Sequence, residues 1–575
     1  MDRNLLLAFA LSFLVLSTWS MVQQKNRAAT PSEVAGEIQE QPREGVDVSP
    51  PQRFPELPEA SPAAPPLRAS AADAEPVRGR EISVDRPLYR VDLDSRGGVI
   101  RRWELKRYVD RRGDPVVLVD FDPSSRVGGA VAGTPLLELE LGDLSSTIWG
   151  IEREEHDLVA FGFEKEGVRV LKTYRFEADT YAFRMLLEIE NASKRDIEPR
   201  FLVDWAAEVR EGNDFREQAL AVLHDGSIES RPVAGLGSAG FFGAMFGKKP
   251  VSVYEPLLGE IDWVGFKTPY FLGALIPDTP ERASARIIVL EQSRAGAVEL
   301  FFDPVRLPPG QSVAREFRGY IGPKEPERLE AMGGDLRAAI DSGWAWVAPL
   351  TRMFSWLLHA LHAIVPNYGV AIIILTLLVR LVTAPLTLKQ MRSMERMRRL
   401  QPKMKQIQAE FAEDRQKQSE AMMRLYKQEK VNPLGGCFPM LLQFPVFIGL
   451  YYALRSSIEL RQAPFVSWID DLSAPDELFM LPGIGIPVRV LPLIMGATMV
   501  LQQKITPMQA DPAQARMMMT IMPIMMTVLF YQFPSGLVLY WMLSNVLAIG
   551  HQLWIGRKMQ PVTATQSKQA GKEDA

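Results

Sequence analysis

The chain has 575 residues and a formal net charge of −4, so it is too long for one domain and gives no global reason to expect a nucleic-acid partner. A single cysteine, Cys437, excludes an internal disulfide framework, and none of the five histidines stands in a zinc-binding pattern. The sequence contains neither a GxxxxGK[ST] phosphate loop nor a GxSxG nucleophile elbow, and we expect no enzymatic activity, cofactor or metal site.

The N-terminal segment, residues 1–23, is expected to be an uncleaved transmembrane signal anchor. Residues 5–22 form a run of 18 residues without a charge, and Trp19 suits the membrane interface. A cleavable signal peptide is the alternative, although the apolar run exceeds a usual signal-peptide core. Residues 24–80 are predicted to be a disordered linker, because they are rich in proline and almost free of aromatic residues.

Residues 81–342 are expected to form an all-β domain. Apolar and polar residues alternate on both sides of the glycine pair at 97–98, and a second hairpin is expected over 168–189. Period-two patterning with Gly and Asp at the joints predicts an antiparallel β-sandwich. A helical stretch over 326–342 is expected to end the domain.

Residues 343–365 are aromatic and weakly charged, with a lone Arg352 and two histidines. Pro349 interrupts the run. This pattern predicts an amphipathic helix that lies in the membrane interface. The alternative is a surface helix docked on the β domain.

Five membrane spans are expected after this helix, because about 20 apolar residues cross a bilayer. Only 14 uncharged residues separate Arg489 from Lys504, so we expect the preceding chain to extend that span. The last two spans are divided at the turn 533–536, in a stretch of 40 residues without Asp, Glu, Lys or Arg. With the N-terminal anchor, the fold class is a polytopic α-helical membrane protein with six transmembrane helices and a five-helix core. The five expected spans are 366–388, 433–455, 484–505, 517–533 and 537–556.

The orientation of these spans follows from a basic segment. Residues 389–430 carry 12 Lys and Arg against 6 Asp and Glu, which predicts a cytoplasmic location for the segment 389–432. Two helices joined near residues 413–414 are expected there. A stripe of apolar residues on the first helix, which includes Met397 and Met404, is expected to pack against the second helix, and contact with incoming chains or the ribosome stays open.

Alternation across the membrane then assigns the remaining segments. The β domain and the loop 456–483 are expected to be periplasmic. Both chain ends, the loop 506–516 and the tail 557–575 are expected to be cytoplasmic. The predicted location is therefore the cell inner membrane, with several passes through the bilayer.

Arg380 is the strongest functional signal, because it lies about 13 Å along a helix from the basic end of its span. An arginine in hydrocarbon costs several kcal/mol unless water or a partner solvates it. No Asp or Glu lies in the predicted spans, so we expect a water-filled groove that receives an acidic group of a passing chain. Snorkelling to the interface is the alternative. Uncharged polar residues that could line the groove, or bond helices together, are Thr376, Gln443, Gln502, Gln503, Ser544 and Asn545.

Methionine is abundant in the third and fourth expected spans after the β domain. Flexible, polarizable methionine side chains accommodate varied apolar ligands. Contact with lipid or gap filling is as good an explanation for any single methionine. The cluster, which includes Met518, Met522 and Met525, predicts an adaptable apolar surface.

Several motifs resemble the YidC family of membrane insertases in its Gram-negative form, which has a large periplasmic domain. Residues 430–439 (KVNPLGGCFP) are similar to the entry of the family's third span, residues 459–465 (ELRQAPF) to the following loop, and residues 533–540 (FPSGLVLY) to the final hairpin. Arg380, followed by Pro385, matches the groove arginine of the family. The resemblance covers residues 340–558 strongly. It extends more weakly over the N-terminal span and the β domain.

The resemblance implies a hydrophilic groove open to the cytoplasm and lipid, a periplasmic β-supersandwich, and insertion of membrane proteins without ATP. Arg380 would attract hydrophilic parts of the substrate, with Tyr540 and Trp541 also in the groove. Apolar segments would slide between the third and fifth helices. The implied slide residues are Met440, Phe444, Met518, Met522 and Met525.

The resemblance also implies partners, namely nascent membrane proteins, the Sec translocon and the ribosome. The tail after residue 556 has only four basic residues, so ribosome binding through it is expected to be weak. The chain departs from the family at Trp541, where a second tyrosine is common, and in extra residues around 482–487.

Other classes of protein fit less well. A solute transporter or channel is the main alternative, although no inverted repeat or second set of intramembrane charges is visible. An intramembrane protease would need a base near Ser535, and no histidine lies close to it in sequence. A carbohydrate-binding β domain on a membrane anchor would not need five further spans.

Overall fold

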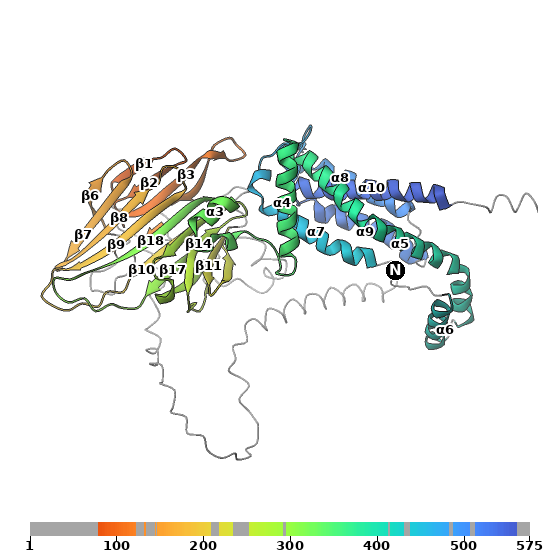
Figure 1. Ribbon diagram of the computed structural model, residues 1–575, viewed down its shortest axis with the longest axis horizontal. Coiled ribbons are helices and arrows are strands. Elements are labelled where there is room, and N and C mark those ends of the chain that lie inside the picture. The colour runs from red at the N-terminus through yellow and green to blue at the C-terminus, as the bar shows by residue number, and fades with distance from the viewer. Residues whose placement is uncertain are drawn as a thin grey trace, which may run out of the picture. The chain divides into compact units, whose positions relative to one another are not determined.

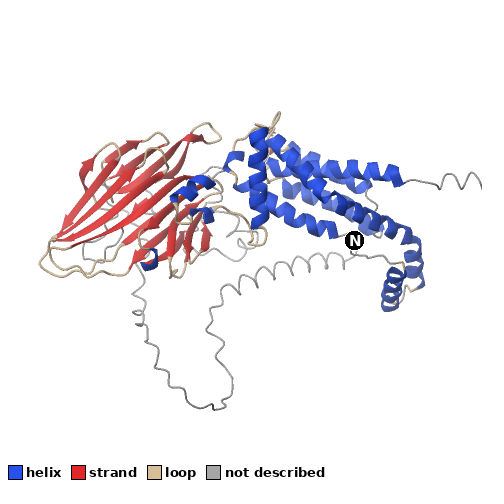
Figure 2. Ribbon diagram, in the orientation of Figure 1, coloured by secondary structure: helices blue, strands red, loops and turns tan. Residues whose placement is uncertain are grey.

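The computed structural model describes residues 79–121, 131–133, 144, 147–208, 218–233, 252–290, 295–411, 414–429, 438–481, 487–505 and 512–559. The expected N-terminal anchor, nearly all of the expected linker and the tail beyond residue 559 lie outside the described residues. Figure 1 labels the elements along the chain. Figure 2 shows that strands make up the N-terminal part of the described chain and helices the C-terminal part.

The strands of the described residues form two nine-stranded antiparallel sheets and a short two-stranded hairpin. The first sheet has the order β1 (Glu81–Asp85), β2 (Tyr89–Asp94), β3 (Val99–Val109), β5 (Val131–Gly133), β10 (Leu202–Glu208), β17 (Ala295–Phe302), β16 (Ala283–Leu290), β13 (Ser252–Val253), with β4 (Pro115–Asp120) also paired with β3. The second sheet has the order β12 (Ser227–Pro232), β11 (Ala219–His224), β14 (Ile261–Lys267), β15 (Phe271–Pro277), β18 (Ser312–Pro323), β9 (Ala182–Asn191), β8 (Val168–Phe176), β7 (Leu158–Lys165), β6 (Gly150–Glu154).

The two sheets share one apolar core, as expected for a sandwich. Trp103 of the first sheet lies 5.7 Å from Phe183 of the second, and Trp205 lies 6.5 Å from Phe266, measured between ring centroids. Burial alternates along β8 and β9, which pair over the predicted hairpin. The predicted β-sandwich is therefore confirmed. Helix α3 (Pro326–Met332) and the 3-10 helix η3 (Leu336–Ala339) follow the last strand, in the predicted helical stretch.

The C-terminal part of the described chain is helical. Two stretches there are long and apolar enough to cross a membrane, Tyr368–Leu388 and Ser535–Leu553, and Val490–Ile505 and Met519–Phe530 are shorter apolar helices. The count of six spans stays a prediction. The helices are α4 (Ala348–Ile364), α5 (Tyr368–Glu410), α6 (Arg415–Gln428), α7 (Phe438–Ser456), α8 (Val490–Ile505), α9 (Pro512–Phe530) and α10 (Ser535–Met559).

The bounds of two helices differ from the segment boundaries expected from the sequence, which stay predictions. Helix α5 runs without a break past residue 388, so the expected span and the first helix of the basic hairpin are one helix of 43 residues. The chain before Arg489 does not extend α8, because β19 (Phe479–Met480) and β20 (Pro487–Val488) form an antiparallel hairpin there. The predicted turn between the last two spans is confirmed, since α9 ends at Phe530 and α10 begins at Ser535.

The basic helical hairpin has its own small core. Met397 and Leu400 of α5 are buried, and Met404 and Tyr426 pack against them. The apolar stripe therefore packs against the partner helix, as expected. Asp414 begins α6 by accepting hydrogen bonds from the backbone N–H groups of residues 416 and 417, which is the role of an N-cap side chain.

Helix α4 is amphipathic in its contacts as well as in its sequence. It packs against α5 and α7, and its buried side chains include Phe354 and Leu358. The opposite face exposes Trp356 (69%) and Ile364 (78%). Large exposed apolar side chains of this kind suit a helix at the membrane interface.

Candidate functional site

Arg380 lies on α5 and bonds to the backbone of α10. Its guanidinium Nη2 donates a hydrogen bond of 2.7 Å to the carbonyl oxygen of Ser544. Helices α5 and α10 pack against each other along this region. The arginine is half-buried, and within the described residues it takes part in no ion pair.

A tyrosine extends this polar contact to a third helix. Tyr540, one turn before Ser544 on α10, is 1% exposed, and its hydroxyl accepts a 2.7 Å hydrogen bond from Nε2 of Gln443 on α7. Arg380 lies close enough to Tyr540 to act on it electrostatically. The structure therefore brings three of the predicted groove residues together, on α5, α7 and α10.

The other predicted polar residues have separate partners. Asn545 donates from Nδ2 to Thr498 Oγ1 on α8 at 3.3 Å. Thr376 is fully buried, and its hydroxyl donates to the carbonyl of Ile372 one turn back, as threonines in apolar helices do. Gln503 has a buried Oε1 without a hydrogen-bond partner among the described residues.

The charge of Arg380 is incompletely satisfied by these contacts. A guanidinium has five N–H donors, and the Ser544 carbonyl accepts one of them. Burying a cation without a counter-ion is costly, so water or an anionic group must supply the remaining acceptors. The arrangement can therefore attract an acidic side chain and can perform no covalent chemistry of its own.

Trp541 belongs to a different set of contacts. Its ring lies 5.0 Å from that of Phe447 on α7 and 5.1 Å from that of Phe530 at the end of α9. These three aromatic side chains join α7, α9 and α10. The structure thus places Trp541 in an aromatic cluster rather than in a hydrogen bond with the Arg380 group.

The predicted slide residues are partly described. Phe444 on α7 is 50% exposed, Met525 on α9 is 46% exposed, and Met522 is half-buried. The side chains of Met440 and Met518 lie outside the described part of the chain. Other large apolar side chains exposed on α9 are Met519, Ile521, Ile524, Val528 and Leu529.

Two partners in the site were not predicted in the roles that the structure gives them: Ser544 was expected only as a polar residue at membrane depth, and Thr498 was not singled out. Ser544 acts through its backbone carbonyl, for which a sequence carries no residue-specific signal. Thr498 lies in the middle of the 14 uncharged residues between Arg489 and Lys504. Its polar side chain at that depth could have identified it as a site residue. Both became visible only when the helices were packed together.

A charged pair joins α4 to the loop after α7. His359 Nε2 lies 3.0 Å from Glu459 Oε1, and the other ring nitrogen lies 2.6 Å from the carbonyl of Ser355. The hydrogen bond with Glu459 raises the pKa of His359 from 6.5 to about 9. Burial opposes ionisation of Glu459, but hydrogen bonds from His359 and Ser457 hold its pKa below its ordinary value of 4.5.

Glu459→Gln is expected to lower the unfolding temperature by about 1–3 °C near pH 6 and by less near pH 10. The raised pKa of His359 means that its contribution is fully present below pH 6.5 and is lost as the pH rises through about 9. The lowered pKa of Glu459 adds stability above pH 4.5, which is lost as the pH falls through its folded value. Thermal unfolding of both proteins between pH 5 and pH 10 measures this difference. An equal difference at both ends of the range would contradict the prediction.

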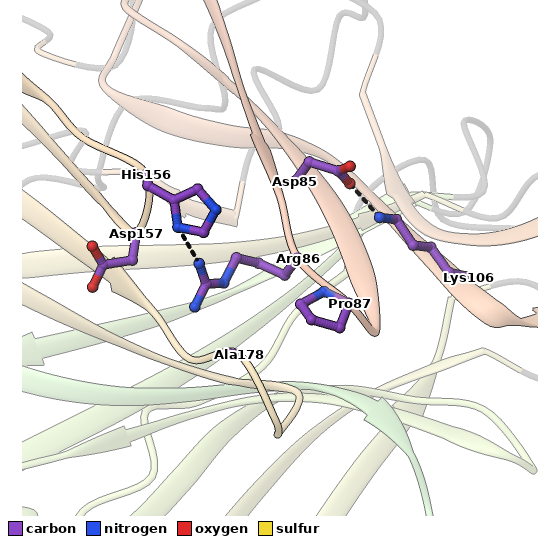
Figure 3. A pocket seen from close by; sticks show the side chains of 7 residues that line it. All are labelled: Asp85, Arg86, Pro87, Lys106, His156, Asp157 and Ala178. Carbon is purple, nitrogen blue, oxygen red and sulfur yellow. Dashed lines mark hydrogen bonds and ion pairs between the residues drawn. The ribbon is translucent and has the colours of Figure 1, made fainter.

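The β domain contains a pocket of about 410 Å³ with a charged rim. Figure 3 shows that the rim groups are mostly paired with one another: Lys106 with Asp85, and Arg86 Nη1 with His156 Nδ1 at 2.8 Å. Asp157 points away from the Arg86 guanidinium. Because most of these charged groups are paired with one another, the pocket has fewer groups free to bind a ligand. We therefore take the Arg380 group as the candidate site.

Comparisons with known proteins cover almost the whole chain. A family model described as "60Kd inner membrane protein" matches residues 360–563, and one described as "YidC periplasmic domain" matches residues 81–357. The membrane protein insertase YidC of Nitratidesulfovibrio vulgaris (strain DP4) is 35% identical over 581 residues, which cover 97% of this chain and 99% of that protein. The protein of the same description from Pelobacter propionicus is 35% identical over 575 residues, with 97% and 99% covered.

The chain is also similar to solved structures that are described as YidC. A crystal structure described as an active YidC insertase with the first transmembrane domain resolved is 19% identical, with a TM-score of 0.35, and the match covers 82% of this chain and 92% of that chain. A crystal structure of YidC from Thermotoga maritima is 15% identical, with a TM-score of 0.27, and the match covers 83% and 99% of the two chains.

Proposed function

Because the chain belongs to the YidC family of membrane protein insertases, we propose that its helical region receives hydrophilic parts of a substrate at Arg380. The protein is an inner-membrane insertase with a β-rich periplasmic domain, and its substrates are nascent membrane proteins. The function needs no bond-breaking chemistry. The membrane helices act by lowering the cost of bringing polar groups into the bilayer.

The observation that carries this proposal is the unneutralised charge of Arg380. It lies on a helix apolar enough to cross a membrane, and the described residues offer it a carbonyl but no carboxylate. An acidic group on the translocated part of a substrate would supply the missing counter-charge. Tyr540 and Gln443 supply nearby polar atoms, which reduce the free-energy cost of holding a charge away from bulk water.

The proposed topology has six transmembrane helices, with the anchor at residues 1–23 and a core of α5, α7, α8, α9 and α10. Both termini would be cytoplasmic. The net charge of +6 over residues 389–430 supports this orientation, because basic loops stay on the cytoplasmic side. The Sec translocon and the ribosome are the proposed protein partners, with weak ribosome contact through the short basic tail.

Apolar parts of the substrate would leave along α7 and α9. Phe444 and Met525 expose about half of their surface, and the neighbouring exposed side chains of α9 are apolar. Such a surface binds varied apolar helices without requiring one shape. The apolar segment would then enter lipid, where its own burial stabilises the product.

The general test is depletion of the protein in its host, followed by protease accessibility of a small two-span test protein. Insertion is expected to stop and to return when this chain is supplied. Normal insertion after depletion would remove the insertase proposal for that substrate.

A photo-crosslinking residue at position 525 or 444 is expected to label the arriving substrate at least about fivefold more than one at Val382. Val382 on α5 is the matched control, because it is apolar and 78% exposed but lies on neither slide helix. The physical reason is contact, since the apolar substrate segment touches α7 and α9 before lipid. The yield of substrate adduct on a gel measures the effect. Equal labelling at all three positions would contradict the slide.

A further inference from the structure

The loop between α7 and α8 supplies hydrogen-bond acceptors to the start of α10. Ser535 is fully buried, and its hydroxyl donates to the carbonyl of Asp471 at 2.7 Å. Its backbone N–H donates to the carbonyl of Ala474 at 2.8 Å, and that of Gly536 donates to the carbonyl of Leu472 at 2.9 Å. The first N–H groups of a helix have no partner inside the helix, so this loop satisfies donors that would otherwise stay unpaired.

The same loop caps α8 through one carboxylate. Asp476 is 3% exposed, and its Oδ2 accepts hydrogen bonds from the backbone N–H groups of Val490 at 2.8 Å and Leu491 at 2.9 Å. The indole N–H of Trp468 donates to the same oxygen at 3.2 Å. The next residue, Pro492, has no N–H to satisfy. A residue 14 positions upstream thus performs the role of the N-cap.

The two capped helices are the ones that complete the Arg380 group. Helix α10 presents the Ser544 carbonyl to Arg380. Helix α8 holds the adjacent Asn545 through Thr498, which lies about 12 Å along α8 from its capped end. A shift of α8 along its axis would therefore change the contact that fixes α10 beside the arginine.

We propose that Asp476 is a positioning residue for the Arg380 site, because its carboxylate fixes the start of α8 and so the register of α8 against α10. The inference rests on the proposed function of Arg380. Asp476 does not touch the substrate. It acts through Thr498 and Asn545, and the backbone acceptors of its loop fix α10 from the same side.

Simple packing does not account for a carboxylate at this position. The second oxygen, Oδ1, is buried without a hydrogen-bond partner among the described residues, which costs free energy. The charge is favoured by the partial positive charge at the N-terminus of α8, where three donors converge on Oδ2. The carboxylate of Asp476 is therefore only partly solvated, and its hydrogen bonds hold the N-terminus of α8 in a fixed position.

The test uses three variants of the full-length protein in membranes. Asp476→Ala removes the acceptor, whereas Asp476→Asn keeps an oxygen for the three donors and removes only the charge. Asp470→Ala is the matched control, because Asp470 is an exposed carboxylate in the same loop. Each variant is made with Arg380 intact and with Arg380→Ala, and the insertion rate of a substrate with an acidic translocated segment is measured.

The register of the two helices is measured separately by disulfide formation. Thr498→Cys and Asn545→Cys are combined in a chain whose own Cys437 is replaced by serine. Asn545 Nδ2 lies 3.3 Å from Thr498 Oγ1, so the two positions face each other between α8 and α10, and the oxidation rate of the cysteine pair reports their register. This measurement does not depend on whether Arg380 contacts substrate.

The expected result is that Asp476→Ala slows insertion about fivefold and slows oxidation of the cysteine pair by a similar factor. Asp476→Asn should keep more than half of both rates, and Asp470→Ala should change neither. With Arg380→Ala already present, Asp476→Ala should cause little further loss, because both changes act on one site.

Different failures have different meanings. Unchanged oxidation and insertion in Asp476→Ala would overturn the positioning role. Additive losses with Arg380→Ala would also overturn it, because the loop would then act independently of the arginine. If Arg380→Ala has no effect while Asp476→Ala slows oxidation, the positioning of α8 stands and the proposed function of Arg380 fails. Protein level and protease resistance of each variant exclude gross unfolding.

Discussion

Arg380→Ala is expected to slow the insertion of substrates with acidic translocated segments at least about tenfold, while the protein reaches the membrane in normal amounts. The change removes the one cation that the described helices place beside Tyr540 and Ser544. A counter-charge in a partly dehydrated site is worth more than about 1.4 kcal/mol, which is tenfold in rate. Stability should hold, since alanine removes a cation whose burial is costly.

Arg380→Lys is the matched variant for this prediction. Lysine keeps the charge but loses the planar fork of donors, so we expect it to restore most of the insertion. A substrate without acidic residues in its translocated segment should respond weakly to both changes. Protease accessibility of the two substrates measures the difference. Full insertion with alanine would retire the role of the charge and leave the insertase itself intact.

Gly265→Ala is expected to destabilise the β domain by about 3 kcal/mol, which corresponds to a fall of about 6–12 °C in its unfolding temperature. A Cβ atom on Gly265 of β14 would lie 1.9 Å from the carbonyl oxygen of Gly273 and 2.9 Å from Cα of Ala274, both on the paired strand β15. These are backbone atoms, so no side chain can move aside. The two strands must separate, and their backbone N–H and C=O groups then lose hydrogen bonds. Leaving these groups buried without a partner costs free energy.

Gly150→Ala is the control for this substitution. Gly150 also lies in a strand, and a Cβ atom there would meet its nearest neighbour, the carbonyl of Gly162, at an ordinary 3.5 Å. We expect a change below about 1 kcal/mol. Calorimetry of the full-length protein measures both. A small shift for Gly265→Ala would show that β14 and β15 can separate without loss.

The sequence was most informative where one physical rule dominates. Period-two alternation predicted the β8–β9 hairpin and the sandwich, because one face of each strand must be buried. Hydropathy located the helices and identified Arg380 as anomalous. The charge pattern also predicted the two-helix basic hairpin, whose joint lies at Asp414.

Local patterns could not predict features that depend on two elements at once. The basic residues after 388 mark where an apolar surface ends, but backbone hydrogen bonding continues, so α5 has no break there. The start of α8 is set by Asp476, 14 residues upstream, and no local capping motif shows it. The Ser544 carbonyl that meets Arg380 is a backbone group, identical in every residue type. Packing alone decides such contacts.

Because α5 is unbroken, Arg380 and the first helix of the basic hairpin belong to one continuous helix. Its 43 residues correspond to a rod of about 65 Å, and about 38 Å of that rod lies beyond Pro385. Pro385 and Pro402 each remove one backbone hydrogen bond of the helix, so bending is easiest at these two positions. A tilt of about 10° at Pro385 moves the far end of the arm by about 7 Å while Arg380, on the other side of the bend, stays in place. A bend at Pro385 would thus move the hairpin end of the rod and leave the contact between Arg380 and Ser544 undisturbed.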